Sequence, residues 1–189
     1  YVGTYDRLKM TKDAGATWEN IKPGLPNYNI TDVAVANNNP DKAWVTFSEY
    51  DNTEKVYETN DAGSSWVNIT GNGLPNLPVN CIVYQGGAND DLYIGTDVGV
   101  YHKDNTMTDW MPYMTGLPNV IIRELEIHYT AGTLSAATYG RGVWESPLNT
   151  LPTNINNIEL VGFTKKESSA VYGMIKSSKF NILTNWLTG

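Results

Sequence analysis

The sequence predicts an all-β fold, part of a β-propeller of about 3.5 four-stranded blades, with a short C-terminal extension. Three signals that recur in a fixed order predict it. They are a Thr-x-Asp turn that ends in tryptophan, a Gly-Leu-Pro connection and a set of short strand-like segments. A tandem unit of about 40–50 residues with four short strands is typical of propeller blades.

The first signal is an eight-residue turn that occurs three times. Intact copies occupy residues 11–18 (TKDAGATW) and 59–66 (TNDAGSSW), and a degenerate copy occupies residues 103–110 (KDNTMTDW). In the degenerate copy Asn105 and Met107 replace the aspartate and the glycine, but the tryptophan is retained. The spacings of 48 and 44 residues set the length of one unit.

Each conserved position of the turn has a structural role. The aspartate carboxylate can accept hydrogen bonds from backbone N–H groups of a tight turn between two antiparallel strands. The glycine permits a positive φ. The tryptophan begins the next strand, and we expect it to pack into the blade core. We therefore interpret the turn as structural. Its structural residues are Asp13, Gly15, Trp18, Asp61, Gly63, Trp66 and Trp110.

The other two signals follow each tryptophan. Gly-Leu-Pro occurs at residues 24–26, 73–75 and 116–118. Three segments come after it, each rich in β-branched and aromatic residues and bounded by turn residues, which predicts strands. The first segments are residues 30–36, 79–85 and 122–129, the second are 43–48, 92–96 and 134–139, and the third are 55–59, 99–103 and 142–146.

The turn resembles the Asp-box, or BNR, repeat of sialidases, of sortilin-type ectodomains and of xyloglucan-degrading glycosidases. It is most similar to the repeats of many-bladed, secreted bacterial Asp-box proteins, and residues 137–144 (ATYGRGVW) resemble the last-blade sequence of such proteins. The resemblance covers roughly residues 1–148. It implies a propeller in which the box lies on the face away from the ligand site. It implies little about function, because the box is a structural turn in all these families.

The blade count leaves the ring incomplete. Residues 1–20 supply three strands of one blade, residues 30–69 and 79–111 supply two complete blades, and residues 122–148 supply three strands of a fourth. Because an open stack exposes blade edges and apolar faces, we expect the missing blades to come from upstream sequence or, alternatively, from another chain. We also expect a strand from the N-terminal part of the ring to complete the last blade.

The remaining residues are expected to be separate from the blades. Residues 149–157 are rich in Pro and Asn and are interpreted as a linker. Residues 158–189 form a C-terminal extension that either opens a further β-domain or closes the propeller. Because the chain starts at Tyr1, within a repeat, we expect it to be a piece of a longer protein.

Composition excludes several classes of function. The formal net charge of −7 argues against a nucleic-acid-binding protein, which needs a basic surface. No segment approaches the ~20 apolar residues of a membrane span. The single cysteine, Cys81, is expected to be buried, and His102 and His128 are too few and too far apart for a zinc site. The polar, weakly charged composition favours a secreted or cell-surface protein.

Several polar residues are expected on the ligand face, where first strands begin and second strands turn into third strands. A cluster of three arginines would suit a sialidase, which clamps a substrate carboxylate. Arg7 and Arg141, however, occupy equivalent places in their repeats, which favours a loop-stabilising role through bonds to backbone carbonyls. The candidate ligand-binding residues are Arg7, Tyr50, Asp51, Arg123, Tyr139 and Arg141.

Carboxylates in the same region suggest a glycosidase as the alternative. Inverting enzymes use two carboxyl groups about 6.5–9.5 Å apart. Asp32, Asp97 and Glu124 are candidates by location only, and the rest of the catalytic set would lie outside this segment. Oxygen-rich loops such as residues 89–91 would suit calcium, but none has a defined ligand spacing, so we expect no metal or other cofactor.

The most favoured function is an extracellular or cell-surface module that binds a glycan or a protein ligand. The alternatives are a glycoside hydrolase and a structural scaffold of a surface assembly. The sharpest structural expectation is that Asp61→Ala or Trp66→Ala destabilises the protein.

Overall fold

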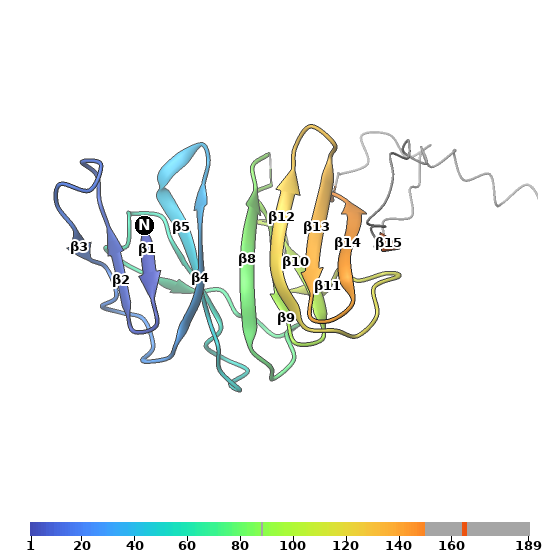
Figure 1. The fold of residues 1–189 in the computed structure, drawn as a ribbon. Coiled ribbons are helices and arrows are strands. Elements are labelled where there is room, and N and C mark those ends of the chain that lie inside the picture. Colours follow the sequence, from blue (N-terminus) through green and yellow to red (C-terminus); the bar gives the residue numbers. More distant parts are fainter. Residues whose placement is uncertain (88, 150–163, 166–189) are drawn as a thin grey trace, which may run out of the picture.

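The computed structural model describes residues 1–87, 89–149 and 164–165 of the chain. In this part the chain forms fifteen strands arranged in four antiparallel sheets. The sheets stand side by side like the blades of a partial propeller (Figure 1). The predicted all-β propeller fold is therefore confirmed. No helix long and apolar enough to cross a membrane occurs in the described part of the chain.

The first two sheets follow the predicted strand order. The first contains β1 (Val2–Thr4), β2 (Arg7–Met10) and β3 (Glu19–Asn20). The second contains β4 (Ile30–Ala36), β5 (Asn39–Phe47), β6 (Val56–Thr59) and β7 (Val67–Asn68). In each sheet consecutive strands pair with one another, so that every connection within a sheet is a hairpin.

The last two sheets repeat this arrangement. The third contains β8 (Val79–Gln85), β9 (Asp91–Thr96), β10 (Gly99–Lys103) and β11 (Met111–Pro112). The fourth contains β12 (Ile122–His128), β13 (Thr133–Thr138), β14 (Gly142–Pro147) and β15 (Thr164–Lys165). The first strands β4, β8 and β12 contact one another in sequence, as the inner strands of neighbouring blades do.

The fourth strand of the last sheet differs from the expectation. Trp144 and Glu145 of β14 pair with Lys165 and Thr164 of β15, so the place expected for a strand from the N-terminal part of the ring is taken by residues from the C-terminal extension. The other residues of the proposed linker and extension, apart from Asn149, lie outside the described residues.

Neighbouring sheets bury apolar side chains between them. In β5, Trp44 packs into the core shared by the second and third sheets, whereas the adjacent Val45 packs into the core shared by the first and second sheets. In β9, Ile94 and Tyr93 divide in the same way between the two cores on either side. Because successive side chains of a strand point to opposite faces, an inner blade needs apolar residues at consecutive positions.

The Gly-Leu-Pro connection inserts a side chain between blades. Leu25, Leu74 and Leu117 each pack against a different one of the three cores. In the second copy, Gly73 leaves room for a close approach of main chains. A Cβ added at Gly73 would lie 1.9 Å from the main-chain oxygen of Trp110. The repeat of this tripeptide therefore reflects the spacing of the blades.

The two intact turns have the same hydrogen bonds. Asp13 Oδ1 accepts from the Thr17 amide at 2.8 Å, and Asp13 Oδ2 accepts from the Thr17 hydroxyl at 2.6 Å. Asp61 and Ser65 repeat both bonds at the same distances. The φ angles of Gly15 and Gly63 are +93° and +86°. These bonds and φ angles are those that a structural role of Asp13, Gly15, Asp61 and Gly63 requires. We call this turn the box turn, and the side of the sheets that carries it the box edge.

The tryptophans of the second and third box turns pack into the core between their own blade and the preceding one, and each also bonds to the main chain of the preceding blade. The indole N–H of Trp66 donates to the Ile21 carbonyl at 2.8 Å, and that of Trp110 donates to the Ile69 carbonyl at 3.1 Å. Trp110 is 1% exposed, whereas Trp18 is 43% exposed. The expectation that Trp18 is packed into a core is wrong, because the described residues contain no blade on its other side.

Candidate functional site

Three of the four exposed tyrosines among the described residues lie on the edge opposite the box turns, and the fourth, Tyr129, lies on the box edge. Tyr5, Tyr50 and Tyr139 lie in the turns that follow β1, β5 and β13, and their exposed fractions are 71%, 65% and 66%. Consecutive hairpins of a meander lie on opposite edges, so these turns share one edge, on the lower side of Figure 1. We call it the tyrosine edge. Three of the four blades present one such aromatic ring on this edge, and each ring offers a flat apolar face with a polar hydroxyl group.

The fourth blade adds a guanidinium to this edge. The Arg123 side chain lies over the ring of Tyr139, with Cζ 5.4 Å from the ring centroid. The turn that carries Tyr139 is held by two bonds, from its own amide to the Ile121 carbonyl at 2.9 Å and from the Thr138 hydroxyl to the Gly142 carbonyl at 2.6 Å. This pair presents an aromatic face and hydrogen-bond donors together, on a braced turn.

The other two arginines also lie on the tyrosine edge, but they do not brace the loops. The nearest charged partner of Arg7 is the exposed carboxylate of Asp6, at 3.8 Å. Among the described residues no backbone carbonyl accepts a hydrogen bond from the guanidinium of Arg7 or Arg141. The main-chain carbonyl of Arg141, and not its side chain, stabilises this turn, because it accepts a hydrogen bond from the Trp144 indole N–H at 3.1 Å. Both guanidinium groups therefore remain open to solvent.

Hydrogen bonds between residues of the loop that carries Tyr50 stabilise its conformation. Asp51 Oδ1 accepts from the amide and the hydroxyl of Thr53, both at 2.6 Å, and the hydroxyl bond is the main cause that lowers the pKa of Asp51. The ammonium group of Lys55 is buried beneath the loop and donates to the carbonyls of Glu49 and Leu77. Asp51 therefore stabilises the loop conformation, in which the Tyr50 side chain is exposed to solvent.

The three candidate catalytic carboxylates have different environments. Asp32 accepts from the amide of Val33 at 2.7 Å and from the amide of Ile82 in the next blade at 2.9 Å. Asp97 accepts from the Asn80 carboxamide at 2.9 Å. Glu124 is exposed, and partial desolvation together with the negative charge of Asp32 raises its pKa. Asp32 therefore links two blades, whereas Glu124 is not tied to the backbone of a neighbouring blade.

Cys81 is buried, as predicted. It takes the place in β8 that Asp32 takes in β4 and Glu124 takes in β12. Desolvation, reinforced by the negative charges of Asp32 and Glu124, raises the pKa of the Cys81 thiol. The thiol is therefore a packing group rather than a nucleophile.

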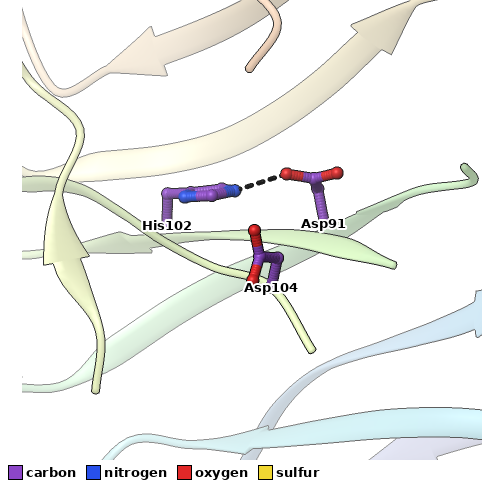
Figure 2. A group of neighbouring side chains, drawn as sticks. All are labelled: Asp91, His102 and Asp104. Atoms are coloured by element: carbon purple, nitrogen blue, oxygen red, sulfur yellow. Dashed lines mark hydrogen bonds and ion pairs between the residues drawn. The ribbon is translucent and has the colours of Figure 1, made fainter. Parts of the chain in front are cut away.

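A second group of ionisable side chains lies buried at the box edge of the third blade (Figure 2). His102 Nε2 is 2.7 Å from Asp91 Oδ1, and Asp104 lies beside both residues. The Thr106 amide and hydroxyl bond to Asp104 Oδ1 at 2.8 and 2.6 Å. Burial raises the pKa of Asp104, but these bonds and the proximity of His102 outweigh it, so the pKa lies below its usual value.

The sequence-based expectation of no zinc site does not anticipate this group, because it considers only pairs of histidines as ligands. His128 lies far along the chain, on β12, and the partners of His102 are carboxylates. The signal was present in the strand register. Leu92 pairs with Lys103, so the next pair along the ladder is Asp91 with Asp104. His102, two residues before Asp104, lies on the same face of the sheet.

The fold matches several solved propeller structures. No protein-family profile matches the sequence, and no curated protein sequence does. YCF48 bound to a D1 peptide matches with a TM-score of 0.52 and 22% identity, over 81% of this chain and 48% of that one. The GH74 xyloglucanase from Xanthomonas campestris matches with a TM-score of 0.56 and 16% identity, over 77% and 26% of the two chains.

A third match is the extracellular domain of BT4673 from B. thetaiotaomicron, with a TM-score of 0.54 and 17% identity, over 77% of this chain and 19% of that one. The chain thus spans about half or less of the length of each of these structures. At these identities the matches establish the propeller-type fold alone.

Proposed function

We propose that the chain is part of an extracellular propeller module that binds a glycan at its tyrosine edge. The observation that carries the proposal is the set of exposed rings of Tyr5, Tyr50 and Tyr139, one on each of three blades along one edge. Aromatic faces stack on the C–H faces of sugar rings, and a row of them suits an extended chain better than a single small ligand.

Charge favours a neutral glycan. The chain carries a formal net charge of −7, so an acidic polymer would be repelled over most of the surface. The Arg123–Tyr139 pair supplies N–H donors that can bond to sugar hydroxyl groups beside a stacking face. The net charge of the chain therefore favours a neutral polysaccharide, whereas the open guanidinium groups of Arg7 and Arg141 on this edge would also admit carboxylate groups.

The comparisons are compatible with this proposal and with a protein ligand. One matched structure is a xyloglucanase and another holds a peptide. The comparisons therefore favour neither ligand class over the other. An extracellular location rests on the polar, weakly charged composition alone.

Binding to neutral xyloglucan tests the proposal. We expect retardation of the protein in a native gel that contains the polysaccharide, and a dissociation constant measurable by calorimetry with xyloglucan oligosaccharides. Tyr50→Ala and Tyr139→Ala should each weaken binding about tenfold, equivalent to ~1.4 kcal/mol. Trp18→Ala is the matched control, because it removes an exposed aromatic ring from the box edge.

The proposal fails if the double variant Tyr50→Ala/Tyr139→Ala binds as tightly as the unmodified protein. It also fails if neither xyloglucan nor any other polysaccharide of a neutral panel is retained. The second result would favour a protein ligand or a scaffold.

Hydrolysis is a second candidate function, supported by Glu124. Its raised pKa, caused by partial burial and by Asp32, is the property required of a general acid. Asp32 itself is a poor partner because both of its carboxylate oxygens accept backbone amides. Release of reducing sugar by the unmodified protein and its loss in Glu124→Gln would establish hydrolysis, whereas binding without turnover would leave the binding module.

A further inference from the structure

The buried group at the box edge of the third blade has the dimensions of a metal site (Figure 2). Ligand atoms of Asp91, His102 and Asp104 all lie within 4.8 Å of one another, and the residues are only 7%, 6% and 6% exposed. Neighbouring ligand atoms of a tetrahedral zinc ion, with bonds of ~2.1 Å, lie about 3.4 Å apart. The spacings here run from 2.7 Å to 4.8 Å and bracket that value.

The charge of the group requires a cation. Two carboxylates buried side by side are strongly destabilising unless they are neutralised. No lysine forms an ion pair with the group among the described residues, although the charges of Lys103 and Asp104 attract each other. Lys42 pairs with Asp90 at 3.0 Å, and the Lys103 ammonium donates to the Met107 carbonyl at 2.6 Å. The imidazole balances at most one of the two charges, and only when it is protonated.

The second blade provides an internal comparison, because the strand register gives each of the three residues a counterpart there. The counterparts are Lys42, Glu58 and Asn60. In that blade the ammonium lies 3.9 Å from the Glu58 carboxylate, and the Asn60 amide donates to the same carboxylate at 2.8 Å. The second blade thus holds one acid, one cation and one amide donor. The third blade holds two acids and one imidazole at the same places.

The box turn has changed in the same blade. Asn105 and Met107 replace the aspartate and glycine that order the intact turns. The carboxylate moves one residue earlier, to Asp104, which points toward His102 and Asp91. The blade that has lost the hydrogen bonds of the intact turn is therefore the blade that has gained a buried group of metal-ligating side chains.

We propose that Asp91, His102 and Asp104 bind one divalent transition-metal ion, for which Zn²⁺ is the probe. One imidazole and two carboxylates suit such an ion, whereas Ca²⁺ prefers six to eight oxygen ligands. The fourth position is open to water. The Asn149 carboxamide borders the site, since its Nδ2 donates to Asp91 Oδ1 at 2.9 Å and lies 3.4 Å from His102 Nε2.

The ion has a structural role. Asn149 follows β14 of the fourth blade, and its amide also donates to the Tyr93 hydroxyl of the third blade at 2.7 Å. An ion held by β9, β10 and the degenerate turn therefore fixes the end of the fourth blade against the third. The site is on the edge opposite the tyrosines, so it is independent of the proposed ligand-binding function.

Titration of the chelator-treated full chain with Zn²⁺ tests the site. We expect one equivalent to bind by calorimetry, a rise in melting temperature on binding, and a visible absorption spectrum of bound Co²⁺ that is perturbed from that of aqueous Co²⁺. Asp104→Asn, which keeps an acceptor oxygen for Thr106, should weaken Zn²⁺ binding at least tenfold. His128→Gln is the matched control and should bind as the unmodified protein does.

Three results would overturn the proposal: no saturable Zn²⁺ binding up to about 1 mM, equal binding in the unmodified protein and Asp104→Asn, or binding of Ca²⁺ without Zn²⁺. The first result would mean that hydrogen bonds with His102, Asn149 and Thr106 hold the two carboxylates without an ion. If Asp104→Asn does not fold by circular dichroism, the Co²⁺ spectrum and Zn²⁺ stoichiometry of the unmodified protein decide the matter.

Discussion

The indole N–H of Trp66 donates a hydrogen bond to the main-chain carbonyl of Ile21, 2.8 Å away, across the boundary between two blades. Trp110 repeats this bond with Ile69 one blade later. The box-turn tryptophans of the second and third blades therefore fasten these blades to the ones before them.

Trp66→Phe should reduce the free energy of unfolding by about 1–2 kcal/mol, because it leaves the Ile21 carbonyl without its donor while keeping an aromatic ring. Trp18→Phe is the matched control. Trp18 has no described blade beside it, and its substitution should change the free energy by less than about 0.5 kcal/mol. Urea denaturation measures both, and equal effects of the two substitutions would contradict the role of the interblade bond.

The box turns should lose their contribution to stability in acid. Hydrogen bonds from the Thr17 hydroxyl and amide, and from Thr11, lower the pKa of Asp13 from 3.8 to about 2. The bonds from Ser65 lower the pKa of Asp61 in the same way. Because the folded-state pKa values are depressed, this stabilisation is present above about pH 4 and is lost as the pH falls toward 2.

Thermal unfolding of the unmodified protein and of Asp13→Asn/Asp61→Asn between pH 5 and pH 2 checks this. The difference in melting temperature should be largest at pH 5 and should shrink toward pH 2, where the aspartates become protonated. A difference that stays constant over this range would mean that the carboxylate charge contributes nothing to the turn.

Gly73→Ala should destabilise the protein by about 3 kcal/mol. The added Cβ would lie 1.9 Å from the main-chain oxygen of Trp110, so the backbone of one blade connection must move away from the next turn. Gly87→Ala provides the comparison, since a Cβ there meets no atom within 4 Å. Chemical denaturation should give a lower midpoint for Gly73→Ala than for Gly87→Ala. Equal midpoints would contradict the close approach of Gly73 to the main chain of Trp110.

Cys81 should be unreactive in the folded protein. The thiol is buried, and desolvation with the charges of Asp32 and Glu124 raises its pKa, so the thiolate is not populated at neutral pH. We expect no modification by iodoacetamide at pH 8 in native conditions and complete modification in denaturant, measured by intact mass. Rapid labelling of the native protein would mean that the first strands separate readily.

The sequence alone determined the blades. The box turns, the Gly-Leu-Pro connections and the short strands between them recur in order, and local turn chemistry acts within a few residues, so the strand order and the bonds of Asp13 and Asp61 follow from the pattern. The sequence also placed Cys81 in the interior and put Tyr50, Tyr139 and Arg123 on one edge, because turns of a repeated hairpin alternate between two edges.

Only the tertiary structure decided what neighbouring blades do to these residues. Trp18 and Trp110 occupy the same place in the repeat, yet one is exposed and the other buried, because burial depends on whether a blade stands beside them. Asp91 and Asp104 are thirteen positions apart, and pairing of β9 with β10 brings them together with His102. A repeat pattern encodes contacts that every blade makes, whereas this group arises from substitutions in a single blade.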